Sequence, residues 1–228
     1  MHLTRQGSGG GHRRRSLHTH LATLRADHVV TVDGSPVTTP ARTLLDVGRT
    51  QRFESAVVAI DSALHQGLVT TQELADMQRS MRRWPGIVRA SRAIAFADGR
   101  SESVGESRTR VQIRHAGLPA PQLQIDLYTP DGEFIGRTDF LFEKQRTVGE
   151  FDGMTKYGRL LVSRVPDSLT PERVSQLLVA EKAREDAIRR LPRAVARWIW
   201  NDLETHSVGS ILSQAFQVGA ALPGFVRW

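Results

Sequence analysis

The stretch EFIGRTDFLFEKQRTVGEFD, residues 133–152, decides the fold of the second half of this chain. It contains two runs of aromatic and β-branched residues, which the polar turn EKQR (143–146) joins. A third run, QLQIDLY (122–128), precedes it across the turn TPDG (129–132). Because turns this short join neighbouring strands, the sequence predicts a three-stranded antiparallel meander.

Helical patterns lie on both sides of this meander. Ser103 with Glu106 three residues later is typical of a helix start, and Gly117 ends that helix. Three further elements follow the meander: a long helix over 171–190, a strand AVARWIW at 194–200, and a closing helix at 207–222. This order predicts an α+β or α/β layer, a sheet flanked by helices.

The first half of the chain has a different pattern of extended and helical segments. Extended runs at 16–24 and 28–39, with an Asp33-Gly34 turn, predict a small β lead. Helices are expected to follow, and their signals are Thr39-Pro40, the segment 52–67 that ends at Gly67, the Thr70/Glu73 capping box, and the segment 84–96. We therefore predict two domains, one over 1–98 and one over 99–228.

Composition limits the class of protein. The chain has 228 residues, of which 39% are hydrophobic and 24% are charged, as in ordinary globular proteins. It has no cysteine, which excludes disulfides and thiolate metal sites. No apolar run approaches the roughly 20 residues of a membrane span, and the N-terminus has no apolar signal segment. We therefore expect a cytoplasmic protein.

The basic charge is unevenly placed. The net charge is +7, and residues 1–26 hold five arginines and no acid. Within them GSGGGHRRR (7–15), with Arg13, Arg14 and Arg15, has the dense cations and low complexity of an arm that contacts nucleic-acid phosphates. A solvated basic loop is the alternative interpretation.

Three acids of the meander suggest a metal site. Glu150 and Asp152 project from one face of the third strand, because side chains two apart in a strand share a face. Asp139, on the second strand, can stand beside Glu150 if the register places the two opposite each other. Paired carboxylates repel unless a cation lies between them, and Mg²⁺ prefers oxygen ligands. Lys156 would add positive charge beside a phosphate.

Structural roles explain part of the same pattern. Glu106 fits a capping box, and Asp152-Gly153 is a common turn pair. In the helix over 171–190, Glu181, Arg184 and Glu185 interrupt the apolar side, which favours a polar cavity beneath it. A solvated helix face is the alternative.

The order Glu106, GRTDF (136–140) and Glu150-Phe151-Asp152-Gly153, followed by Lys156-Tyr157, resembles the DUF559 and very-short-patch-repair-like branch of the PD-(D/E)XK nuclease superfamily. Residues 99–204 are also similar to actinobacterial proteins that are often labelled type IV toxin–antitoxin AbiEi-like, and residues 1–98 resemble the middle region of those proteins. Such proteins usually begin with a winged-helix DNA-binding domain ahead of a segment like MHLTR. We therefore expect this chain to be a shortened reading frame or a fragment.

The resemblance implies a restriction-endonuclease-like core that binds Mg²⁺ or Mn²⁺ at Asp139 and Glu150, with Glu106 nearby, and cleaves DNA through a metal-activated water. It also implies that Lys182 and Arg189 lie near the DNA. The superfamily's lysine usually lies two residues after the acid. Asp152 holds that place here, so Lys156 would have to reach in from the next turn. The main hypothesis is therefore a metal-dependent DNA endonuclease. A non-catalytic DNA-binding regulator of antitoxin type is the alternative, and a protein-interaction module is a third possibility.

Overall fold

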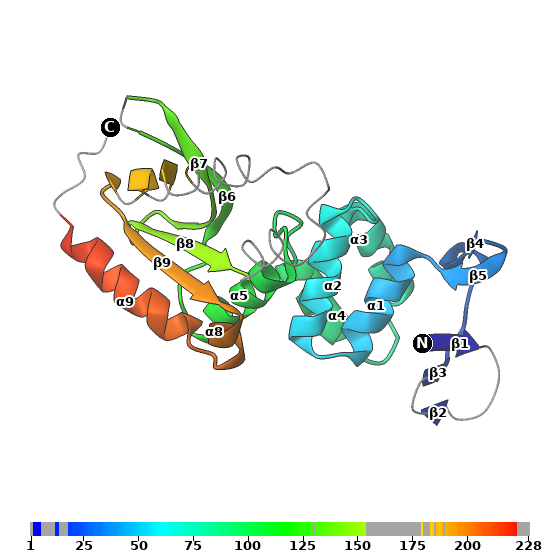
Figure 1. Cartoon of the computed structure of the whole chain (residues 1–228). Coiled ribbons are helices and arrows are strands. Elements are labelled where there is room, and N and C mark those ends of the chain that lie inside the picture. Colours follow the sequence, from blue (N-terminus) through cyan, green and yellow to red (C-terminus); the bar gives the residue numbers. More distant parts are fainter. Residues whose placement is uncertain are drawn as a thin grey trace.

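The structure is a computed structural model, and Figure 1 shows its course. It describes residues 2–5, 12–13, 18–129, 131–153, 179, 183–184, 186–188 and 190–222. Small sheets near the N-terminus lead into a helical bundle, and α5 lies between this bundle and a four-stranded sheet. The predicted α+β class is confirmed.

The predicted β lead forms two small sheets. β1 (His2–Arg5), β3 (His18–Leu21) and β2 (His12–Arg13) form one sheet in that order. β4 (Val29–Val32) and β5 (Ser35–Thr38) form an antiparallel hairpin. Its turn residues Asp33 and Gly34 have φ of 48° and 74°. Positive φ at both positions gives the turn the twist that a two-residue hairpin requires.

The bundle contains α1 (Pro40–Thr50), α2 (Phe53–His65), α3 (Thr71–Ser80) and α4 (Ile87–Phe96). Thr39 caps α1 ahead of Pro40, and both halves of the predicted capping box at Thr70 and Glu73 form. Capping satisfies backbone N–H groups that have no partner within the helix. The bundle core is apolar, with Leu45, Val57, Ile60, Leu74 and Met81 at its centre.

Helix α5 (Val104–His115) is buried on most sides. Eight of its 12 residues are buried. Val111 packs in the core of the bundle, whereas Ile113 packs in the core of the sheet layer. The two halves of the chain therefore share this helix in their packing.

The main sheet has the order β6-β7-β8-β9. Its strands are β6 (Gln122–Tyr128), β7 (Phe134–Phe142), β8 (Thr147–Asp152) and β9 (Ala194–Ile199). The first three pair antiparallel, which confirms the predicted meander, and β9 pairs parallel to β8. The sheet is therefore mixed.

Apolar side chains cover both faces of this sheet. On one face, α5, α8 (Trp200–Glu204) and α9 (Val208–Ala221) enclose a core of Phe140, Phe142, Trp198, Leu203 and Leu212. Figure 1 shows α9 running along β9. A second cluster contains Leu127, Leu141, Val148 and Ile188. None of the helices in the described part of the chain is long and apolar enough to span a membrane.

The strand prediction for 194–200 was one residue too long. Trp200 begins α8, because the Asp202 carboxylate accepts the Ile199 backbone N–H at 2.9 Å and ends the strand there. Trp198 is 1% exposed, and its indole N–H donates to Thr109 Oγ1 at 2.8 Å. Trp198 is therefore a packing residue of the core.

Candidate functional site

A cleft of about 790 Å³ lies where the bundle meets the sheet layer. The side chains that border it come from α2, the start of α5, β6, β7, the end of β8 and the start of α8; they include His65, Glu106, Gln124, Asp139, Phe151 and Trp200. Two of the predicted metal ligands, Glu106 and Asp139, therefore border the same space.

Glu106 is both a capping residue and part of the cleft wall. Its carboxylate accepts from the Ser103 hydroxyl at 2.6 Å and from the Glu102 backbone N–H at 2.9 Å. The Ser103 hydroxyl in turn accepts the Glu106 backbone N–H at 3.2 Å. The predicted cap is thus confirmed, although the carboxylate reaches Glu102 rather than Ser103 on the backbone. The Gln124 side-chain amide is the third donor to the Glu106 carboxylate, at 2.9 Å.

Asp139 lies where the sheet ladder is interrupted. Phe140 pairs with Gly149, so the next step of this register sets Asp139 opposite Glu150, but the β7–β8 ladder ends at Phe140. Asp139 Oδ2 instead accepts the Phe151 backbone N–H at 2.9 Å. The side-chain carboxylate thus satisfies an N–H group that a longer ladder would have paired.

The neighbouring strand is irregular at the same level. β6 pairs with β7 at Leu123 and again at Ile125, and Gln124 between them has φ of 54°. This left-handed backbone is uncommon outside glycine, asparagine and aspartate. In this conformation, the Gln124 side chain donates a hydrogen bond to Glu106 on α5. The irregular point of the sheet is therefore also the wall of the cleft.

Glu150 is neutralised within the protein. Arg184 Nη1 donates to its Oε1 at 3.0 Å, and Arg197 donates to its Oε2 from Nε at 2.9 Å and from Nη2 at 2.8 Å. Arg197 is the register partner of Glu150 on β9, and Glu150 itself is 8% exposed. The two guanidinium groups thus supply the positive charge that a metal ion would otherwise supply to this carboxylate. Glu150 does not border the cleft.

The other predicted site residues divide in two. Asp152 is half-buried at the end of β8, and Arg13 lies in β2. Arg14, Arg15, Lys156, Lys182 and Arg189 lie outside the described residues, as does most of the helix predicted over 171–190. Within the described part of the chain, no three acidic or histidine side chains gather so that they could hold a metal ion. The metal site therefore stays a prediction.

Sequence reasoning missed Gln124 and Arg197. Gln124 carries no local signal for its left-handed backbone. Arg197 could have been found, because it is the one charge in the otherwise apolar strand AVARWI. Arg184 had such a signal: it interrupts the apolar side of its predicted helix, and it reaches Glu150 as a residue above a polar site should.

Comparisons with known proteins address the first half of the chain. Residues 3–95 match the family described as the AbiEi antitoxin C-terminal domain, which covers β1 to most of α4. This match supports the AbiEi-like resemblance and does not extend to the sheet that borders the cleft.

Two curated relatives come from Mycobacterium tuberculosis. They are the uncharacterized protein MT2308 of strain CDC 1551 / Oshkosh and the uncharacterized protein Rv2248 of strain ATCC 25618 / H37Rv. Each is 34% identical to this chain over 123 residues, which are 54% of this chain and 45% of the relative. The chain thus matches less than half the length of these relatives. No solved structure matches it significantly.

Proposed function

We propose that this protein is a DNA-binding regulator of the antitoxin type, in which the sheet layer is a non-catalytic scaffold. The observation that carries this proposal is the match of residues 3–95 to an antitoxin domain family. The net charge of +7 is consistent with a polyanionic partner. A regulator of this kind would act in the cytoplasm.

The ion pairs of Glu150 support a scaffold role for the sheet layer. A carboxylate that already accepts from two arginines gains little from a cation, because both of its oxygens are engaged. These ion pairs connect β8 to β9 and to the helix that carries Arg184. In a regulator, the acid that the resemblance assigns to metal binding would thus hold strands and helix together.

A metal-dependent endonuclease is the second candidate. The observation that favours it is the cleft, which brings Glu106 and Asp139 together beside the end of β8. In that case Asp139 and Glu106 would hold Mg²⁺ or Mn²⁺. A bound ion of this kind activates water for phosphodiester cleavage.

One experiment separates the two candidates. The purified chain is mixed with a DNA duplex in a mobility-shift assay, and it is incubated with supercoiled plasmid and Mg²⁺ or Mn²⁺. Asp139→Asn is the decisive variant, since an amide oxygen can still accept the Phe151 N–H while the charge is lost. Asp131→Asn, in the exposed turn before β7, is the matched control.

The regulator predicts retarded DNA and an intact plasmid for all three proteins. Nicking that Asp139→Asn abolishes and Asp131→Asn retains would support the endonuclease and end the scaffold proposal. A chain that neither retards nor nicks DNA contradicts both candidates.

A further inference from the structure

A second concentration of positive charge lies far from the N-terminal arm. Residues 77–97 hold five arginines, Arg79, Arg82, Arg83, Arg89 and Arg92, and no acid. Outside this segment and residues 1–26, acids outnumber lysines and arginines by 24 to 21. The excess positive charge of the chain therefore sits in these two segments.

The structure places this segment at the surface, over the end of α3, the turn at 81–86 and α4. All five arginines are exposed. Arg79 pairs with Asp76, and Arg89 Nη2 donates to the Gln51 carbonyl at 2.7 Å. Within the described part of the chain, the guanidinium groups of Arg82, Arg83 and Arg92 have no hydrogen bond or ion pair. We call the exposed set Arg82, Arg83, Arg89 and Arg92 the α3–α4 arginine surface.

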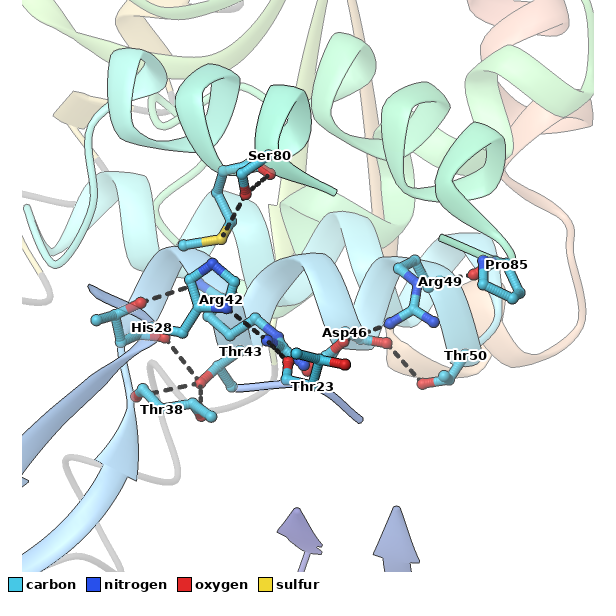
Figure 2. A network of polar contacts seen from close by, with 12 residues as sticks. Thr23, His28, Thr38, Arg42, Thr43, Asp46, Arg49, Thr50, Ser80 and Pro85 are labelled. Carbon is cyan, nitrogen blue, oxygen red and sulfur yellow. Dashed lines mark hydrogen bonds and ion pairs between the residues drawn. The ribbon is translucent and has the colours of Figure 1, made fainter. Parts of the chain in front are cut away.

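The turn that carries this surface is anchored to α1. The Trp84 ring contacts two guanidinium groups, with Arg42 Cζ at 4.5 Å and Arg49 Cζ at 4.9 Å from its centroid. Arg49 Nε also donates to the Pro85 carbonyl at 2.7 Å, as Figure 2 shows. Gly86 has φ of 79°, and an added Cβ there would lie 2.7 Å from the Arg49 carbonyl oxygen. A turn held at three successive residues loses little further entropy when a ligand binds.

The nearest acid of this network does not neutralise the surface. Asp46 accepts from Arg42 Nε at 2.8 Å and from Arg49 Nη1 at 2.5 Å, so both of its oxygens are used inside the network (Figure 2). Arg42 itself is fully buried and also contacts His28 Nδ1 at 2.8 Å. Arg42, Asp46 and Arg49 thus support the turn, and the Asp46 carboxylate contacts no arginine of the α3–α4 arginine surface.

We propose that the α3–α4 arginine surface binds the phosphate backbone of nucleic acid. The proposal rests on the proposed function and assigns it a binding site. Arginine forks match phosphate oxygens, and a row of cations without acids releases counterions when it meets a polyanion. A protein partner fits less well, because docking surfaces usually centre on aromatic or aliphatic anchors. Here Arg42 and Arg49 lie over the Trp84 ring, and Val88 is the one large apolar side chain of α4 that is exposed.

The test compares two variants of the full chain that each lower the net charge by two. Arg82→Ala/Arg83→Ala removes two cations of the surface. Lys144→Glu makes the same change in the exposed turn between β7 and β8, where Lys144 likewise has no ion pair among the described residues. Fluorescence anisotropy with a labelled duplex gives the affinity at several salt concentrations, and poly-glutamate serves as an acidic polypeptide competitor.

The surface double variant is expected to bind the duplex roughly tenfold more weakly at 0.1 M salt. The slope of log K against log salt should be smaller in magnitude by about 2, since each phosphate contact contributes about 0.9. Lys144→Glu should keep the wild-type slope. Circular dichroism of the double variant should match the wild type, because Arg82 and Arg83 support no other described residue.

Three outcomes would overturn the site. If the double variant binds DNA as Lys144→Glu does while the wild type binds DNA, the proposed function stands and its binding site lies elsewhere. If poly-glutamate competes with the duplex for the wild type but not for the double variant, and the double variant keeps its DNA affinity, the surface is a docking site for an acidic protein. A wild type that binds no DNA contradicts both the site and the proposed function.

Discussion

Arg110 of α5 and Asp61 of α2 form an ion pair with an Nη1–Oδ2 distance of 2.6 Å, away from solvent. Arg110 also donates to the Ser101 hydroxyl at 3.2 Å and to the Phe96 carbonyl. Asp61 accepts the Asp98 backbone N–H at 2.7 Å. The pair therefore joins the bundle, the connection at 96–101 and the helix that the sheet layer shares.

Replacing Arg110 by methionine should destabilise the protein by about 3–5 kcal/mol, because it leaves the buried Asp61 carboxylate without its countercharge. Urea denaturation followed by circular dichroism measures this loss. The double variant Arg110→Met/Asp61→Asn should recover part of it. A single variant as stable as the wild type would show that the pair does not hold the two halves together.

The Arg110→Met variant should also change how the stability of the protein depends on pH. Burial raises the pKa of Asp61 above its ordinary value of 3.8, even with Arg110 beside it. A raised pKa means that the unfolded chain loses this proton first, so stability falls as pH rises from about 3.8 through the folded pKa. Arg110→Met should extend this fall to higher pH, and Asp61→Asn should remove it. Denaturation midpoints between pH 4 and 8 give the comparison.

His28 should make the N-terminal region sensitive to acid. Burial, together with the positive charge of Arg42, lowers the pKa of His28 below its ordinary value of 6.5, although Asp27 opposes this shift. The Arg42 Nη1 contact at 2.8 Å requires an unprotonated Nδ1. Since the folded pKa is lowered, stability should be lost as pH falls below about 6.5, where the unfolded chain takes up the proton. The thermal midpoint of the wild type should therefore fall between pH 7.5 and 5.5.

His28→Asn is the matched variant, because its side-chain oxygen can take the place of Nδ1 as acceptor without titrating. Its thermal midpoint should fall less than that of the wild type over the same pH range. Equal slopes for the two proteins would rule out His28 as the source of the acid sensitivity.

Local signals made much of this fold predictable. The turns at 129–132 and 143–146 lie between paired strands, and Ser103 and Thr70 cap the helices that they were expected to begin. Each signal concerns residues within a few positions of one another. The parallel pairing of β9 with β8 had no such signal, because some 40 residues separate the two strands and their partnership depends on tertiary packing.

The candidate site was harder to predict for the same reason. One more step of the β7–β8 register would set positions 139 and 150 opposite each other, as the sequence allowed, yet the ladder ends at Phe140. Asp139 satisfies a backbone N–H group, and Glu150 accepts from arginines of β9 and of the helix that precedes it. A hydrophobic pattern shows that Arg184 and Arg197 interrupt apolar segments, but it shows neither which acid they contact nor where a ladder ends.

Glu150→Ala should reduce the free energy of unfolding by about 2–3 kcal/mol, because Arg184 and Arg197 then lose their shared acceptor in a mostly buried site. Asp126→Ala is the contrasting variant. It breaks the ion pair between Asp126 and Arg137 on the same sheet. Because this pair is exposed to solvent, its loss should leave the free energy of unfolding unchanged. If Glu150→Ala is as stable as Asp126→Ala, the two arginines do not use Glu150 as a structural partner.

Gly105 should tolerate no side chain where α5 crosses β8. A Cβ on Gly105 would lie 1.9 Å from Phe151 Cε1 and 2.3 Å from Cζ, so either the Phe151 ring would have to move or α5 and β8 would have to separate. Alanine in a helix is otherwise favoured over glycine by about 0.5–1 kcal/mol. We expect Gly105→Ala nevertheless to lower stability by about 1–3 kcal/mol, as overpacking does in cores. Gly105→Ala/Phe151→Val removes the clashing ring atoms and should be more stable than Gly105→Ala alone, as measured by thermal denaturation. A Gly105→Ala variant more stable than the wild type would contradict this close packing of α5 on the sheet.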